Sequence, residues 1–380
     1  MIKQVSNTKH ILYRVASVLT LIFILISCEA FTTSPSQTTD PTETAVTQTG
    51  QTNPTPELPA IYQSQYLNPL DKPRTYVEEI CKYLKNRWNP LNAEPGTVVM
   101  VIYFHNITNS PTGDPESIAL IEFQKIMQQL KVQGFEAIPT KKFLFFMEQN
   151  IKIPPRSVLI IQDGNYDAQY YARYFREYWN NWGWTVVNAW PSQAEIPDTL
   201  WEENMALERE KFVDHQALGV SADITLSEES SKAIITRELD GSLSAFAEHF
   251  AKTPYAFIWP NGGFGVRPIQ AARQLGYQLG FTSNSRGPVM YNWVPLADEV
   301  DPERPSHLPE ALINDPLMTI PRYSSDEALD AIDAVRASGK EAAAYAEANK
   351  AKEVEYYEAY AGQNMVPCQP HNQQMEVSHV

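Results

Sequence analysis

The chain has 380 residues, of which 43% are hydrophobic and 20% are charged, so most of it can bury a core. Its formal net charge of -15 argues against binding to nucleic acid and against electrostatic adhesion to anionic lipid. Seven histidines and three cysteines are too few and too scattered for a structural zinc module.

Residues 1–28 have the pattern of an export signal. Lys3, Lys9 and Arg14 precede an apolar run over residues 15–27, which is short for a membrane span. The run ends in Leu-Ile-Ser followed by Cys28, which resembles the lipobox of bacterial lipoproteins, where the cysteine is lipidated and becomes the mature N-terminus. An uncleaved signal anchor with an incidental cysteine is the alternative. We therefore expect an extracytoplasmic bacterial protein anchored to the membrane by lipid at Cys28.

The next segment, residues 29–60, is rich in Thr, Pro and Ser and has almost no large apolar residue. Such a segment cannot bury enough surface to fold, so we interpret it as a linker. About 30 flexible residues span roughly 30 Å root-mean-square, which would hold the folded part off the membrane.

From residue 97 onward, strand patterns alternate with helix patterns. Apolar, β-rich runs predict strands at residues 97–104, 157–161, 185–189, 212–217, 255–259 and 277–281. Four helices are expected between these strands. The first has Asp114 as N-cap and Gly134 beyond its end, and the second covers residues 168–179. The third begins at Ser227, and the fourth covers residues 267–275. Repeated strand–helix units predict an α/β fold with a parallel sheet, closed or nearly closed into a distorted barrel.

The tail, residues 324–380, is predicted to be a helical extension. Ser324 and Glu327 have the spacing of a capping box, and residues 341–360 are rich in alanine and glutamate. The predicted organisation is therefore a signal at 1–28, a linker at 29–60, a folded domain at 61–323 and the extension at 324–380.

Once Cys28 is lipidated, Cys81 and Cys368 are the only cysteines left in an exported, disulfide-permissive protein. They flank the barrel, and the termini of a barrel often approach each other. We predict a disulfide between them, with two unpaired thiols as the alternative.

Side chains at the carboxyl ends of strands usually carry the chemistry of such barrels. His105, Asp163, Leu218 and Asn261 lie at or just past these ends. Five segments around them have a familiar order and spacing. They are "VIYFHNI" at 101–107, "RSVLIIQDGNYD" at 156–167, "ALGVSADITLSEE" at 217–229, "AFIWPNGGFGVRPIQAARQLGYQLGFTS" at 256–283 and "LMTIPRYSSDEAL" at 317–329.

This order resembles the polysaccharide deacetylases, the NodB-homology domain of carbohydrate esterase family 4. The resemblance covers roughly residues 98–322 and implies metal-assisted removal of an N-acetyl group from a glycan. In the family one aspartate is the general base, while a second aspartate and two histidines hold the metal. A catalytic zinc site needs about three protein ligands and an open position for water.

Carried over residue by residue, only one of these four groups is present. Asp163 matches the metal-binding aspartate, Gln162 stands at the position of the base, and Leu218 and Ala222 stand at the positions of the histidines. Gln162 cannot take a proton at neutral pH, and neither apolar side chain has a donor atom. By this count the inherited reaction is lost, and no cofactor is expected.

A rearranged metal site, built from Asp163, His105 and Asp223, is the alternative, and zinc would be its metal. A capping role is the simpler interpretation of Asp223. His215 is expected to point to the opposite face of its strand, and His249 to be a packing or surface residue.

Aromatic residues suggest where a glycan would bind. The predicted substrate-binding residues are Trp259, Asn261, Asp167 and Arg322, with a turn as the simpler role of Asp167. The aromatic segment over residues 166–190 is expected to pack on the barrel as a helix, with some exposed members available to a glycan.

Three hypotheses follow. The first is a surface lipoprotein with a catalytically degenerate deacetylase-like barrel that binds or organises an envelope or extracellular polysaccharide. The second is an active carbohydrate N-deacetylase with a rearranged metal site. The third is a scaffold that contacts another envelope protein through its acidic helical tail.

Overall fold

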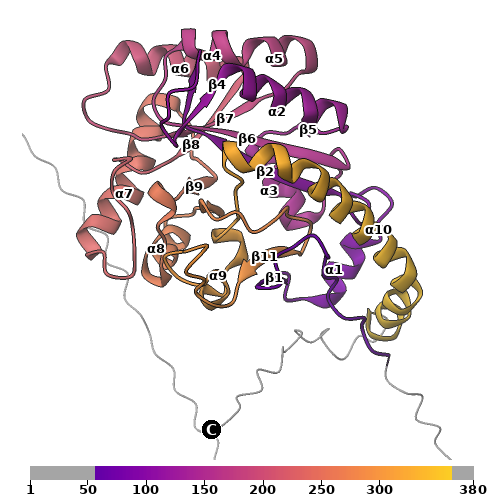
Figure 1. The fold of residues 1–380 in the computed structure, drawn as a ribbon. Coiled ribbons are helices and arrows are strands. Elements are labelled where there is room, and N and C mark those ends of the chain that lie inside the picture. The colour runs from indigo at the N-terminus through magenta and orange to yellow at the C-terminus, as the bar shows by residue number, and fades with distance from the viewer. Residues whose placement is uncertain (1–55, 362–380) are drawn as a thin grey trace, which may run out of the picture. The chain divides into compact units, whose positions relative to one another are not determined.

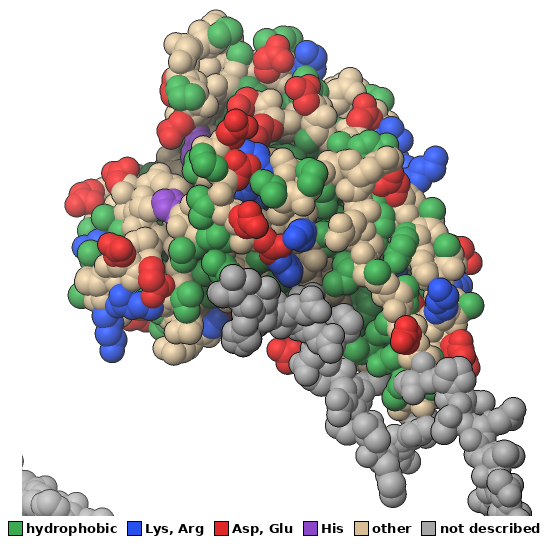
Figure 2. All heavy atoms as spheres, turned by 60° about the horizontal axis from the view of Figure 1, so that its bottom comes forward, with side chains coloured by type: hydrophobic (Ala, Val, Ile, Leu, Met, Phe, Trp, Pro, Cys, Tyr) green, Lys and Arg blue, Asp and Glu red, His purple; other side chains and the backbone are tan. Residues whose placement is uncertain are grey.

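The computed structural model describes residues 56–361 (Figure 1). The predicted signal with Cys28, nearly all of the linker, and Cys368 lie outside the described residues. Within residues 56–361, no helix is both long and apolar enough to cross a membrane. On the face shown in Figure 2, acidic and basic side chains are interspersed with apolar ones. The negative charge is therefore spread over this face rather than gathered in one patch.

The centre of the fold is a parallel sheet, as predicted. Its strands are β2 (Val98–Phe104), β6 (Arg156–Asp163), β7 (Val186–Trp190), β8 (Val213–Ala217), β9 (Ala256–Ile258) and β10 (Leu279–Phe281). They lie in the order β10-β9-β8-β7-β6-β2, and the short β5 (Glu136–Ala137) also pairs with β6. Two pairs lie outside the sheet, one antiparallel and one parallel: β1 (Asp71–Arg74) with β11 (Val294–Ala297), and β3 (Asn106–Thr108) with β4 (Ser117–Ala119).

The extended segment 320–323 connects the two edges of this sheet. At one edge, Ile320 N–H donates to Gly280 O at 2.8 Å. At the other edge, Tyr323 exchanges hydrogen bonds with β2, to Val101 O at 2.8 Å and from Tyr103 N–H at 3.0 Å. The sheet is thereby curled into the predicted barrel, and the closing segment carries Arg322 between its edges.

Helices surround the strands. In Figure 1, α2 (Leu120–Val132), α4 (Ala168–Tyr174), α5 (Arg176–Trp182) and α6 (Asp198–Glu210) lie above the sheet. Below it lie α1 (Ile80–Arg87), α8 (Val266–Gln274) and α9 (Glu310–Ile313). The remaining helices are α3 (Thr140–Gln149), α7 (Lys232–Ala245) with a π-helical turn at Phe246–Phe250, α10 (Ser325–Ala361), and 3₁₀ turns at Pro260–Gly262 and Pro316–Met318.

Two predicted helix starts are wrong. Asp114 does not cap α2, because its carboxylate accepts from Glu116 N–H at 3.0 Å and from the Ser117 hydroxyl at 2.7 Å, within a turn that leads into β4. Ser227 is likewise in a turn, and α7 begins at Lys232, four residues after the expected first residue Glu228, with Ser231 as its N-cap. In both places a short polar side chain forms hydrogen bonds within a turn, which it can do as readily as it caps a helix.

The aromatic segment packs on the barrel as expected, but as two short helices rather than one. Helix α4 ends at Tyr174 and α5 begins at Arg176, with Phe175 between them. Tyr171, Tyr174 and Tyr178 are buried in the core on this side of the sheet. Most of the segment is therefore core, whereas Tyr166 at its start is half-buried and bonds His105 and Asn106 beside the end of β2.

Helix α10 is a continuous helix of 37 residues that packs against β2, α1 and α2. The predicted capping box is present, since the Ser324 hydroxyl donates to the Glu327 carboxylate at 2.9 Å. A glycine pair allows the close approach: a Cβ added at Gly339 would lie 2.8 Å from Gly96 O and 3.0 Å from a methyl of Val98.

Candidate functional site

Asp163, the last residue of β6, is paired with an arginine. Nη1 of Arg322 lies 3.0 and 3.1 Å from the two carboxylate oxygens of Asp163. Both side chains are buried, with Asp163 6% and Arg322 2% exposed. The residues are 159 positions apart, and the closing segment 320–323 brings them together. The charge of the Asp163 carboxylate is thus balanced within the protein.

The guanidinium of Arg322 has further partners that fix its place. Its Nε donates to Thr282 O at 2.6 Å, and its carbon lies 4.3 Å from the centre of the Tyr103 ring. His105 packs edge-on against the same ring at 5.4 Å. Burial raises the pKa of Tyr103 although the positive charge of Arg322 opposes this, so the phenol stays neutral. Arg322, predicted as a substrate-binding residue, is instead held in the interior.

Gln162, at the position of the family's base, makes contacts on the other side of the strand. Its amide nitrogen lies 3.2 Å from Phe104 O and also bonds His105 O, while its amide oxygen accepts from Tyr170 at 3.2 Å. The side chain is fully buried. Gln162 therefore ties the end of β6 to the end of β2 and to α4, which is a structural role.

The two positions that match the family's histidines are apolar and packed. Leu218 is 5% exposed and belongs to the core inside the barrel, and Ala222 packs against the same cluster. Asp223 is exposed, in the turn that follows. His105, Asp163 and Asp223 do not form a ligand set: among residues 56–361, no group of three or more His, Cys, Asp or Glu side chains could hold a metal ion.

The residues present therefore do not fit the metal that the resemblance implies. A divalent ion at Asp163 would have to displace a buried guanidinium that contacts both carboxylate oxygens. It would then face Leu218 and Ala222, which have no donor atoms. We derive no metal-dependent step for this chain.

The other predicted substrate-binding residues have different positions. Trp259 is fully buried, and its indole N–H donates to Met318 O at 2.8 Å, so the expected contact with a glycan is corrected to a core role. Asp167 caps α4 by accepting from Tyr170 N–H at 2.8 Å. Asn261 is exposed, has a left-handed φ of 53°, and donates to the Thr225 hydroxyl at 3.0 Å. Of Trp259, Asp167 and Asn261, only Asn261 is exposed and does not cap a helix.

Tyr166 is the aromatic residue that sequence reasoning placed in a packed segment but that lies at the strand ends. Its ring stacks on Tyr170 at 3.9 Å, and its hydroxyl bonds His105 O and Asn106 Oδ1, the latter at 2.8 Å. Asn106 is exposed, and Tyr166 and His105 are half-buried. The sequence did offer a signal for this placement: Tyr166 follows Asp-Gly-Asn and therefore lies only three residues beyond the end of β6.

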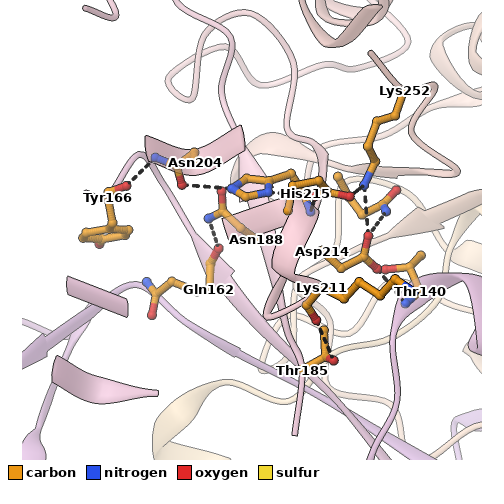
Figure 3. Close-up of polar contacts among 12 residues, drawn as sticks. Thr140, Gln162, Tyr166, Thr185, Asn188, Asn204, Lys211, Asp214, His215 and Lys252 are labelled. Atoms are coloured by element: carbon orange, nitrogen blue, oxygen red, sulfur yellow. Dashed lines mark hydrogen bonds and ion pairs between the residues drawn. The ribbon is translucent and has the colours of Figure 1, made fainter. Parts of the chain in front are cut away.

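A buried polar network supports Tyr166 from behind, between β8 and α6 (Figure 3). Asn204 donates to the carbonyl oxygens of Tyr166 and Leu200, both at 2.9 Å. With both amide protons used, Asn204 Oδ1 accepts from Nε2 of His215 at 2.9 Å. His215 is fully buried, on the helix side of β8 as predicted.

The network continues from His215 to charged groups. Nδ1 of His215 lies 2.9 Å from the Glu208 carboxylate, which also pairs with Lys252 at 2.7 Å. Lys252 contacts Asp214 at 3.0 Å, and Asp214 accepts from Thr140 N–H at 2.8 Å. Burial opposes ionisation of Glu208, but His215 and Lys252 outweigh it and lower the pKa of Glu208 to about 2. This network links the loop after β6 to the N-terminus of α3 at Thr140.

Several solved deacetylases have a fold similar to this barrel. A deacetylase of Streptococcus pyogenes solved with acetate is 13% identical with a TM-score of 0.49, covering 63% of this chain and 99% of that one. A polysaccharide deacetylase of Bacillus cereus is 12% identical with a TM-score of 0.46, covering 63% and 69%. A de-N-acetylase of Aggregatibacter actinomycetemcomitans is 13% identical with a TM-score of 0.47, covering 63% and 99%.

All three TM-scores are below 0.5, and these similarities concern the fold alone. No family model and no curated protein matches the sequence.

Proposed function

We propose that the protein is a surface lipoprotein that binds an envelope or extracellular polysaccharide through a deacetylase-like barrel without hydrolysing it. The observation that carries this proposal is the ion pair between Asp163 and Arg322. In this pair Arg322 contacts the one carboxylate that matches the family's metal site, and both side chains are buried.

The same geometry supports the proposed absence of hydrolysis. An acetamide is hydrolysed when a metal acidifies a water molecule and a nearby base removes its proton. Here the carboxylate is neutralised by Arg322, and the side chain at the base position is an amide bonded to backbone carbonyls. The chain supplies neither a base nor a ligand set at these positions.

Binding is supported by the polar and aromatic groups that remain at the strand ends. Tyr166 offers a partly exposed ring, and Asn106 and Asn261 offer exposed amides. Aromatic faces match the C–H faces of pyranose rings, and amides bond their hydroxyl groups. The predicted lipid at Cys28 and the linker would place this surface outside the membrane.

The test measures binding and hydrolysis on the full-length protein, with acetylated chito-oligosaccharides as the probe. We expect saturable binding without release of acetate, and a metal content well below one ion per chain. Tyr166→Ala is expected to weaken binding by about 1–2 kcal/mol. Tyr357→Ala on α10 is the matched control, because it removes a partly exposed tyrosine from the far end of the molecule, and it should leave binding unchanged.

Two results would overturn the proposal. Acetate release that is lost in Asp163→Ala, together with bound zinc, would establish an active deacetylase with a rearranged site. Equal binding by wild type and Tyr166→Ala would remove the strand ends as the glycan site.

A further inference from the structure

A cavity lies at the opposite end of the barrel from Asp163, beside the start of β2. Its volume is about 120 Å³, and it is bounded by the segment 58–62, by α1 and α10, by the loop 290–293 and by the residues that lead into β2. We call residues 58–62 the strap, because they cross between α10 and the loop 290–293. The strap is also where the chain coming from the predicted linker enters the fold.

Six aromatic rings line this cavity: Tyr62, Tyr83, Phe146, Tyr291, Trp293 and Tyr345. Five of them form two groups. Tyr62 lies 5.8 Å from Trp293 and 5.6 Å from Tyr345, and Tyr83 lies 5.8 Å from Tyr291, between ring centres. Burial raises the pKa of Tyr83 to about 12, so its ring is a neutral phenol in the cavity wall.

The polar ends of four of these rings are already engaged by the protein. The Tyr62 hydroxyl donates to Glu341 at 2.8 Å, and the Tyr345 hydroxyl donates to Ala60 O at 2.7 Å. The Trp293 indole donates to Tyr62 O at 2.8 Å, and the Tyr291 hydroxyl accepts from Asn86 at 3.1 Å. A ligand in the cavity would therefore meet ring carbon more than ring hydroxyl groups. This arrangement does not suit a sugar, which needs many hydrogen-bond partners.

The charges at the cavity favour a cation. Glu94, Glu353 and Arg87 are the charged residues in its lining. Arg87 is paired with Glu353 at 2.9 Å, and Glu353 is 4% exposed. The pair is neutral as a unit, so Glu94, whose side chain is exposed, leaves the lining with one net negative charge. Aromatic faces carry negative electrostatic potential and attract cations for the same reason.

We propose that this cavity binds a small organic cation of the quaternary ammonium class. A cage of aromatic rings is the usual recognition site for such cations. The size fits a trimethylammonium head group, since an apolar cavity of about 150 Å³ in another protein admits benzene. The ligand would lie under the strap, so its binding also holds the strap against α10. This proposal is independent of glycan binding at the strand ends.

The test compares choline with 3,3-dimethylbutan-1-ol, its uncharged isostere, by titration calorimetry on the full-length protein. We expect choline to bind at least tenfold more tightly. Tyr83→Leu removes one ring but none of the hydrogen bonds that hold the strap, and it should weaken choline binding about three- to tenfold. Tyr66→Leu, a change at a tyrosine that is 48% exposed and outside the cavity lining, is the matched control and should have no effect.

Equal affinity for the two isosteres would overturn the proposal, because charge would then have no part in recognition. Absence of choline binding by folded wild type would overturn it as well. A loss of choline affinity in Glu94→Gln, with an unchanged unfolding midpoint, would support it without depending on any aromatic substitution.

Discussion

At the scale of single residues, the pair between Asp163 and Arg322 decides what the strand-end site can do. A buried ion pair is a weak source of stability, but removing one partner leaves the other charge buried and unpaired. Arg322, at 2% exposure, has no route to water that would lessen this cost. The pair therefore has a clear signature in unfolding measurements.

We predict that Asp163→Ala lowers the free energy of unfolding by about 3–5 kcal/mol. The double change Asp163→Ala with Arg322→Met should cost much less than the sum of the single changes, because it leaves no unpaired charge. Urea unfolding of the four proteins in this cycle measures the coupling. A cost below about 0.5 kcal/mol for Asp163→Ala would contradict the pairing.

Glu208 gives a second prediction, on pH dependence. Its pKa is lowered from 4.5 to about 2 in the folded protein. A lowered pKa stabilises the fold at pH above 4.5, and this contribution is lost as the pH falls from 4.5 toward 2. Each pKa unit corresponds to about 1.4 kcal/mol.

Between pH 5 and pH 2, wild type should therefore lose roughly 3 kcal/mol more unfolding free energy than Glu208→Gln, which has no carboxylate to protonate at this position. Denaturant unfolding at a series of pH values gives both curves, and the other carboxylates contribute to both. Parallel curves would show that His215 and Lys252 do not hold Glu208 ionised.

At the scale of elements, α10 is part of the folded core rather than an appended tail. Ala328, Ile332, Val335 and Ala342 on this helix are buried in the same cluster as residues of β2 and α2. The glycine pair Gly96 and Gly339 sets how closely the helix approaches the start of β2.

Gly339→Ala tests this contact, because close docking of α10 decides whether the change raises or lowers the free energy of unfolding. In an open helix the change would stabilise by about 1 kcal/mol, because alanine has the higher helix propensity. Here the new methyl group would meet Gly96 O at 2.8 Å, which is backbone and cannot move aside easily. We expect a loss of about 1–3 kcal/mol instead. Lys340→Ala at the exposed neighbouring position is the control, and a stabilised Gly339→Ala would show that α10 is not docked this closely.

At the scale of the whole molecule, the cysteines connect the fold to its expected location. Cys81 on α1 is disulfide-bonded. Cys28 and Cys368 lie outside the described residues, so lipidation at Cys28 and the pairing of Cys81 with Cys368 stay predictions.

We predict that the mature protein in the membrane fraction has a diacylglyceryl group on Cys28 and a disulfide between Cys81 and Cys368. Cys28→Ala should release the protein from the membrane without unfolding it, since Cys28 precedes the folded part. Mass spectrometry of non-reduced peptides decides both points. Two free thiols, or an unmodified Cys28 in the mature chain, would contradict them. A bridge closing a loop this long contributes roughly 5 kcal/mol in the chain-entropy treatment.

The sequence by itself predicted the six main strands of the parallel sheet and their alternation with helices. It also determined that Gln162, Leu218 and Ala222 stand at the positions where the resemblance implies a base and two histidines. Hydrophobic runs such as that at 157–161 are local patterns, and Leu218 or Ala222 lacks a donor atom in any fold. The sequence could not show that Arg322 neutralises Asp163, because the two meet only when segment 320–323 closes the barrel. It also could not show that Trp259 is core, or that six rings from five separate segments line one cavity. Those features depend on contacts between distant parts of the chain, which only the tertiary structure brings together.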